Sequence, residues 1–191
     1  MKTISVEHLS KSYGSQSVLK DVCFSATEEQ ITCIMAVSGK GKTTLLRILL
    51  GLEQADSGTV SLPQNCRWSV VFQEDRLLEQ MDAMGNLRFV LGNEFDEAAA
   101  RALLEELGLV EYEGKPVRDF SGGMKRRLAL ARALLAPSDA LALDEPFTGL
   151  DEENRARAIA CVRKLTCGKP VLVVTHHEDD VSGLNARFIR L

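Results

Sequence analysis

A glycine-bearing loop between an apolar run and an amphipathic segment constrains this chain more than any other feature. Residues 31–35 are apolar and predict a buried strand, and residues 44–50 predict a helix that Gly51 ends. The loop between them reads AVSGKGKT. Strand, glycine loop and helix form the order that a phosphate-binding loop requires. We therefore expect an α/β fold built around this unit.

The chemistry of the loop suits a polyphosphate. Consecutive backbone N–H groups there can surround phosphate oxygens, and the positive end of the following helix reinforces them. Lys42 is expected to neutralise the terminal phosphates, and the Thr43 hydroxyl to bind Mg²⁺. Taken alone, the motif leaves open a chance Gly-Lys-Thr at a helix start.

The rest of the chain predicts a single domain over residues 1–191. Short strands around Ile4 and Val6 and over residues 18–24 are expected to form an N-terminal antiparallel β-subdomain, and residues 75–135 to form a mostly helical subdomain. Within it, helices are predicted at 96–108 and 122–136. Strands at 140–143, 171–175 and 188–191, with a helix that Gly168 ends, complete the pattern. This alternation predicts a largely parallel sheet covered on both faces.

Two carboxylates, Asp144 and Glu145, follow the predicted strand at 140–143. Ligands bind at the carboxyl edge of an open α/β sheet, so both are candidates for the site. Asp144 suits the surroundings of Mg²⁺, and Glu145 suits a general base that deprotonates water. An ordinary helix cap is the alternative for this pair.

A second glycine pair lies in Phe-Ser-Gly-Gly-Met over residues 120–124, before the predicted helix. The glycines let the backbone approach an anion, to which Ser121 and the helix N-terminus can donate. A plain serine N-cap with a flexible entrance is the alternative.

Taken together, these motifs closely resemble those of the ABC ATPase family over essentially the whole chain. Residues 36–43 resemble its Walker A loop, residues 141–145 its Walker B strand with the catalytic glutamate, and residues 121–124 its signature motif. The family's loop usually begins with glycine, whereas Ala36 stands here. The expected effect of Ala36→Gly on nucleotide affinity is no more than about tenfold.

Further positions match this family in order and spacing. Gln73 matches the Q-loop glutamine, an expected Mg²⁺ ligand, and His176 matches the switch histidine; His177 is the alternative for the latter. Tyr13 matches the aromatic that stacks on adenine, or is a surface aromatic at a turn. The resemblance implies catalytic roles for Glu145, His176 and Gln73, and metal contacts from Thr43, Gln73 and Asp144. It implies contacts with ATP from Tyr13, Val37, Ser38, Gly39, Lys40, Gly41, Lys42, Thr43, Thr44, Ser121, Gly122, Gly123, Met124 and Asp151.

The resemblance also implies partners. Members work as head-to-tail pairs, so a second copy of this chain is expected to cover the bound ATP. Residues 71–78 and 144–151 are similar to those of nitrate, sulfonate, taurine and thiamine-precursor importer ATPases. This implies a membrane permease docking near residues 73–89, a substrate-binding protein outside, and a peripheral place on the inner membrane face. Met81, Met84, Leu87 and Phe89 are expected either to contact the permease or to pack in the core.

Composition excludes several other functions. The net charge of −4 argues against nucleic acid as a partner. The N-terminus does not resemble a signal peptide, and no apolar run approaches the ~20 residues that span a bilayer. Five cysteines without a CxxC pair predict neither a disulfide framework nor a zinc site, which indicates a reducing cytoplasm. A non-transport ABC ATPase and a weakly hydrolysing regulatory module remain the alternatives.

Overall fold

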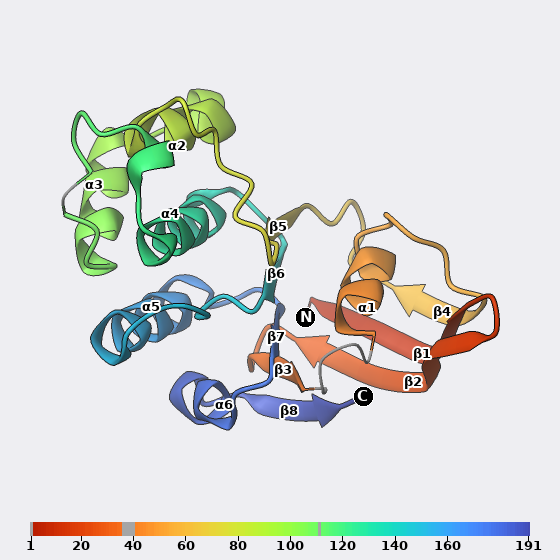
Figure 1. Ribbon diagram of the computed structural model, residues 1–191. Helices are drawn as coiled ribbons and strands as arrows, with labels where there is room; N and C mark the ends of the chain where they lie inside the picture. The colour runs from red at the N-terminus through yellow and green to blue at the C-terminus, as the bar shows by residue number, and fades with distance from the viewer. Residues whose placement is uncertain (1, 36–40, 111) are drawn as a thin grey trace.

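A five-stranded parallel sheet lies at the centre of the computed structural model, which describes residues 2–35, 41–110 and 112–191 (Figure 1). Every neighbouring pair of strands in this sheet runs parallel, so all the carboxyl ends lie along one edge. In spatial order the strands are β5 (Trp68–Val71), β6 (Ala140–Asp144), β7 (Val171–Thr175), β3 (Thr32–Met35) and β8 (Arg187–Arg190).

A separate antiparallel sheet is formed by the N-terminal part of the chain. Its order is β2 (Gln16–Thr27), β1 (Thr3–Tyr13) and β4 (Ser57–Ser61). Helix α1 (Lys42–Leu49) follows β3 and lies beside this sheet (Figure 1). Four of its side chains are buried: Leu45, Leu46, Ile48 and Leu49. Gly41, just before α1, thereby lies next to Val18 and Leu19 of β2.

The parallel sheet buries both of its faces, because alternate residues along each strand point to opposite sides. Ile34, Ala142 and Val174 pack in one core with α1 and the antiparallel sheet. Their strand neighbours Leu143 and Val173 pack in a second core with the remaining helices. The prediction of a parallel sheet covered on both faces is confirmed, and so is that of an N-terminal antiparallel β-subdomain, which helps to cover one face.

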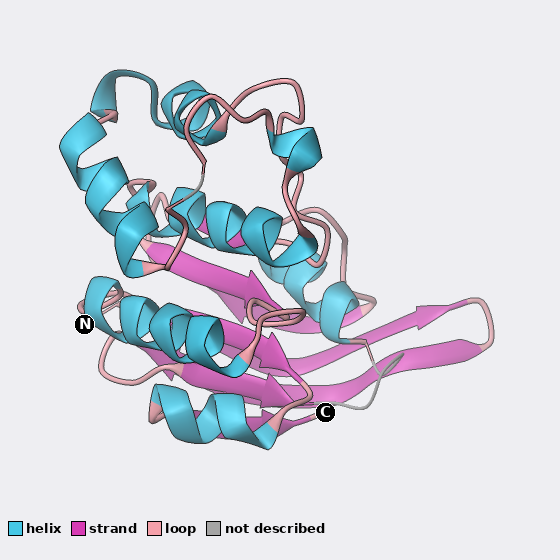
Figure 2. Ribbon diagram, turned by 60° about the vertical axis from the view of Figure 1, so that its left-hand side comes forward, coloured by secondary structure: helices cyan, strands magenta, loops and turns pink. Residues whose placement is uncertain are grey.

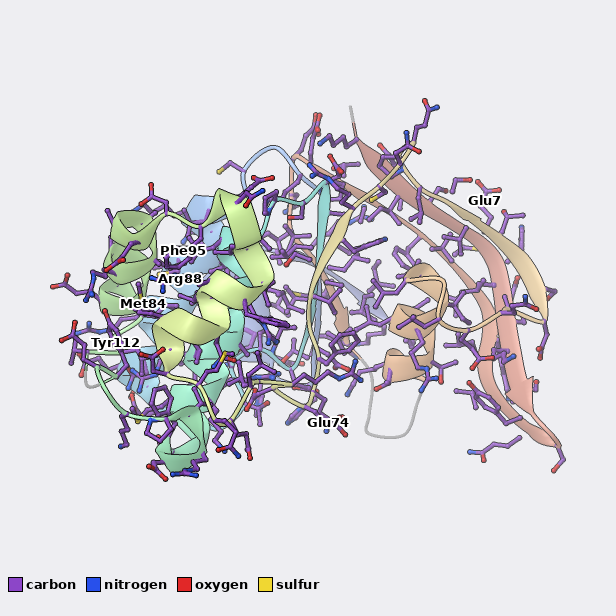
Figure 3. The ribbon with its side chains drawn as sticks, turned by 90° about the horizontal axis from the view of Figure 1, so that it is seen from above. Glu7, Glu74, Met84, Arg88, Phe95 and Tyr112 are labelled. Carbon is purple, nitrogen blue, oxygen red and sulfur yellow. The ribbon has the colours of Figure 1, made fainter. Side chains whose placement is uncertain are left out.

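The remaining helices are α4 (Gly122–Leu135), α5 (Glu152–Leu165), α6 (Glu178–Leu184), α2 (Ala83–Leu91) and α3 (Glu97–Glu106), with short 3₁₀ turns at Gly92–Glu94 and Val117–Asp119. Helices α2, α3 and α4 pack on one another and form a helical group, of which α3 and α4 also contact α5 (Figures 1 and 2). Figure 3 shows Met84, Arg88, Phe95 and Tyr112 within this group, at the opposite end of the molecule from Glu7.

Most predicted elements are present with small shifts of their ends. Helix α1 begins at Lys42 rather than at residue 44, and α4 ends one residue before the predicted 136. Asp96 caps α3 by accepting from the backbone N–H groups of Ala98 and Ala99. Strands β4 and β5 and helix α6 were not predicted, because each is short and carries little periodicity. No helix within the described residues is both long and apolar enough to cross a membrane.

Candidate functional site

The start of α1 requires glycine at residue 41. Gly41 caps the helix with a φ of 82°, in the left-handed region. A Cβ atom there would lie 2.8 Å from the Val18 carbonyl oxygen and 2.8 Å from a Leu19 methyl. No side chain fits in that space, so Gly41 lies in close contact with β2. The predicted contacts Val37, Ser38, Gly39 and Lys40, like Ala36, fall outside the described residues.

Three charged or titratable side chains converge where α1, β6 and β7 meet. The Nζ atom of Lys42 lies 3.3 Å from Oε1 of Glu145. The same oxygen lies 2.8 Å from Nδ1 of His176. An ionised carboxylate can only accept hydrogen bonds, so Glu145 accepts from His176 in the tautomer that carries a proton on Nδ1. Glu145 is largely buried, whereas half of the His176 side chain is exposed and faces the cleft described below.

The backbone of Glu145 is held in an unusual conformation. Its φ is 50°, in the left-handed region that glycine favours. Its N–H donates to the Val174 carbonyl at 2.8 Å, and its carbonyl accepts from the Arg126 guanidinium. Its second carboxylate oxygen, Oε2, is buried and has no hydrogen-bond partner among the described residues. A buried acceptor without a partner indicates that a donor belongs there when the site is filled.

Asp144 precedes Glu145 and is the more completely buried of the two. Burial raises the pKa of the Asp144 carboxyl, and the charge of Glu145 raises it further. Arg126, Lys42 and a hydrogen bond with the Thr43 side chain act in the opposite direction. A carboxylate with a raised pKa beside a threonine hydroxyl offers hard oxygen ligands that a divalent cation would stabilise.

These groups line a cleft of about 1160 Å³. Of the residues predicted to form the site, the cleft wall includes Gly41, Lys42, Thr43, Thr44, Gln73, Gly122, Gly123, Asp144, Glu145 and His176. The wall also includes residues to which the sequence analysis assigned no role: Val18, Met35, Asp75, Arg126, Thr148, Arg190 and Leu191. Of these, Arg126 lies in a basic run directly after the signature motif, which is the one signal that could have singled it out.

Four of the described predicted residues do not line this cleft: Tyr13, Ser121, Met124 and Asp151. Tyr13 is 47 % exposed at the end of β1, where the Lys11 ammonium lies 5.3 Å from its ring centre. Ser121 accepts from the Met124 backbone N–H as the N-cap of α4. Asp151 accepts from the Asn154 N–H and caps α5. Each cap satisfies a helix terminus, as the alternative interpretation of Ser121 stated, and Ser121 remains exposed on the surface.

The predicted apolar contact segment divides into two kinds of residue. Met84 and Leu87 are buried in the core of the helical group, as the core-packing alternative stated for them. Met81 and Phe89 are 42 % and 67 % exposed. Phe89 lies on the exposed side of α2, whose buried face packs on α4, whereas Met81 precedes the helix.

The residues present fit a nucleoside triphosphate and a divalent cation. Gly41 leaves room for close backbone approach, Lys42 supplies a cation, and Glu145 Oε2 is a buried acceptor with no donor among the described residues. Thr43 and Asp144 supply a hydroxyl and a carboxylate side by side. This donor set matches what phosphate oxygens and Mg²⁺ require.

The chain is similar to known proteins over most of its length. Residues 19–148 match the family described as ABC transporter. The aliphatic sulfonates import ATP-binding protein SsuB 1 of Paracoccus denitrificans is 36% identical over 96% of this chain and 76% of its own length. SsuB 2 of Paraburkholderia xenovorans is 38% identical over 97% of this chain and 75% of its own length.

A solved dimeric structure of a bacterial ABC transporter cassette superposes with a TM-score of 0.84 and 26% identity, covering 98% of this chain and 94% of that one. The family match covers more than half of the chain, and the relatives match along most of their length. The chain is therefore an ATP-binding ATPase of the ABC transporter family.

Proposed function

We propose that this chain is the ATP-hydrolysing subunit of an importer and that the cleft above Lys42 and Glu145 is its active site. The observation that carries the proposal is the meeting of Lys42, Glu145 and His176 at the carboxyl ends of β6 and β7. The relatives named as import ATP-binding proteins support the transport role.

Each residue of this group has a distinct task in hydrolysis. Lys42 and the loop N–H groups hold the β- and γ-phosphates. Glu145 accepts a proton from the attacking water as a bond forms between water oxygen and the γ-phosphorus, and the bond to the bridging oxygen of ADP breaks. His176, half exposed and hydrogen-bonded to Glu145, orients that carboxylate and contacts the γ-phosphate. Tyr13 stacking on adenine stays a prediction.

Mg²⁺ would be held by Thr43 and Asp144, with Gln73 as a further ligand. When bound, it neutralises charge on the phosphate oxygens. The pair formed by Thr43 and Asp144 supports this assignment, because the raised pKa of Asp144 indicates a carboxyl that lacks a sufficient positive partner.

A second copy of the chain completes the site in this proposal. Ser121 to Met124 of one copy would cover ATP held by Lys42 of the other, and Asp151 would lie at the interface between the copies. Ser121 and Gly122 are exposed at the N-terminus of α4, where another chain can reach them. The dimeric form of the solved ABC cassette supports this arrangement.

The permease is proposed to dock near residues 73–89, which include the start of the helical group. Exposed apolar side chains cluster in sequence there at Leu78, Met81, Phe89 and Val90. Gln73, just before this segment, lines the cleft, so the docking segment and the ATP site are adjacent in the chain. An interface core of apolar side chains is typical of stable protein contacts.

The remaining proposals rest on the relatives and on charge. The solute is proposed to be a small molecule of the nitrate, sulfonate, taurine or thiamine-precursor type, delivered by an extracytoplasmic binding protein. The chain would then sit at the inner face of the membrane. The net charge of −4 supports the proposal that nucleic acid is not a partner of this chain.

ATP turnover by the purified chain tests the catalytic part of the proposal. We expect Mg²⁺-dependent hydrolysis that falls by at least about 100-fold in Glu145→Gln, since a general base contributes 10²–10⁴-fold. Glu152→Gln, an exposed position early in α5, is the matched control and should retain activity. Absence of turnover in the wild type, alone and with its permease, would favour a regulatory module. Co-purification with ribosomes or DNA instead of a permease would contradict transport.

A further inference from the structure

The side chain of Arg126 connects three parts of the active site that are far apart in the sequence. Arg126 lies in the second turn of α4 and is 4 % exposed. We infer that Arg126 is a positioning residue for hydrolysis, which holds Glu145 and the Gln73 segment in fixed relation to the helix that carries the signature motif. This inference rests on the proposed catalytic role of Glu145.

One side of the guanidinium binds the end of β6. Nη2 donates to the carbonyl of Glu145 at 2.6 Å and also to the carbonyl of Asp144. Nε donates to the same Glu145 carbonyl at 3.2 Å. Two donors of one rigid group therefore converge on the backbone of the proposed general base.

The other side of the guanidinium binds the segment that follows β5. Nη1 donates to the Phe72 carbonyl at 2.7 Å and lies 3.4 Å from the Gln73 carbonyl. The same nitrogen donates to the Asp75 carboxylate at 3.0 Å. Asp75 compensates the buried positive charge, so the ion pair and the backbone contacts support one another.

These contacts act on catalysis through the backbone of Glu145. A residue other than glycine at a φ of 50° keeps that conformation only when its surroundings impose it. The Glu145 N–H is fixed by Val174 and its carbonyl by Arg126, so the peptide groups on both sides of its Cα are held. Release of the carbonyl would let the backbone relax and move the carboxylate away from Lys42 and His176.

Arginine suits this task better than lysine. Its planar group presents five N–H donors in fixed directions, and here they reach two separate segments at once. A lysine ammonium is a single nitrogen that can bind one of the two segments closely. Arg126→Lys therefore keeps the buried charge and the stem but removes the bridge.

Arg132 provides a matched control on the same helix. Its guanidinium donates to the carbonyls of Arg76 and Asp75 at 2.7 and 2.9 Å, so it also anchors the segment after β5. No hydrogen bond from Arg132 to β6 is found among the described residues. Arg132→Lys should lower thermal stability without moving the proposed base.

The experiment measures steady-state ATP turnover and thermal unfolding for the full chain and its variants. We expect Arg126→Lys to lower kcat by at least about tenfold while KM for Mg-ATP changes less than about threefold, because the change affects the chemical step and not ground-state binding. Arg132→Lys should keep kcat within about twofold of the wild type, although its melting temperature falls by about as much as that of Arg126→Lys. Equal losses of kcat in both variants, or an unchanged kcat in Arg126→Lys, would overturn the inference.

A double variant separates positioning from general damage to the fold. If Arg126 acts through Glu145, Arg126→Lys adds less than about threefold to the loss already caused by Glu145→Gln in single-turnover hydrolysis of labelled ATP. Independent losses that multiply would contradict the inference. A fully active Glu145→Gln would instead contradict the proposed role of Glu145. If Arg126→Lys does not fold, Asp75→Asn, which weakens only the partly buried ion pair with Arg126, should lower kcat with KM retained; an unchanged kcat there would also overturn the inference.

Discussion

The ammonium of Lys42 lies 3.3 Å from the Glu145 carboxylate, which joins the start of α1 to the end of β6 across the cleft. A phosphate group entering the cleft would compete with Glu145 for this ammonium. Charge-assisted hydrogen bonds of this kind contribute about 1.5–3 kcal/mol.

Lys42→Ala is therefore expected to weaken binding of an ATP analogue by at least about tenfold, which corresponds to 1.4 kcal/mol. Fluorescence titration with a labelled nucleotide measures the change. Lys20→Ala, on the exposed side of β2, is the control and should bind as the wild type does. Unchanged affinity in Lys42→Ala would place the nucleotide elsewhere.

Gly41→Ala is expected to damage both the fold and nucleotide binding. The new Cβ would lie 2.8 Å from the Val18 carbonyl oxygen, and the φ of 82° adds about 1–2 kcal/mol of strain. Gly51→Ala, at the other end of α1, has a φ of 69° but nothing within 4 Å of its Cβ, so it carries the strain without the clash. Thermal unfolding should show a larger loss for Gly41→Ala; equal losses would mean that the contact with β2 is unimportant.

Asp144→Asn is expected to stabilise the chain in the absence of Mg²⁺. The pKa of Asp144 is raised by burial and by Glu145, so its ionised form opposes folding at neutral pH. The stabilising contribution of its protonated form is complete at low pH and is lost as the pH rises through the raised pKa. The neutral amide should raise the melting temperature by roughly 2–4 °C for each 1 kcal/mol regained, and should abolish stabilisation by Mg-ATP.

Asp151→Asn is the control with the opposite sign, because hydrogen bonds from Asn154 lower the pKa of Asp151. Its melting temperature at neutral pH should fall. If the melting temperature of Asp144→Asn falls as well, the proposed charge imbalance at Asp144 is contradicted.

The lowered pKa of Asp139 predicts that the stability of the chain depends on pH in the acid range. Its carboxylate accepts from the Arg67 backbone N–H and from Lys2, which lowers its pKa from 3.8 to about 2. A lowered pKa contributes stability that is complete above the ordinary value and lost as the pH falls toward the lowered one. Asp139→Asn should therefore destabilise at pH 7, with a difference from wild type that shrinks between pH 3.8 and about 2. A constant difference across this range would contradict the assignment.

The strand, loop and helix order around the glycine loop could be predicted because local sequence determines each part. Residues 31–35 are apolar, and Gly41 needs a conformation that other residues avoid. The position of Asp144 and Glu145 could also be predicted, because a parallel sheet brings the ends of its strands to one edge.

The role of Arg126 could not be predicted, since it depends on three segments meeting in space. A basic residue after a helix start usually points to solvent, whereas this one is buried among backbone carbonyls. The burial of Met84 and Leu87, in contrast with exposed Phe89, depends on which face α2 turns toward α4. Periodicity indicates that a helix has an apolar face but not which neighbour covers it.

A mixing experiment tests most directly whether two copies build one ATP site. Lys42→Ala and Gly123→Asp, each in the Glu145→Gln background, are prepared separately and then combined with Mg-ATP. The proposed head-to-tail arrangement predicts that the mixture alone forms a dimer that retains nucleotide, because the intact loop of one copy meets the intact signature of the other. A mixture that stays monomeric and retains no more ATP than the separate variants would contradict the shared site.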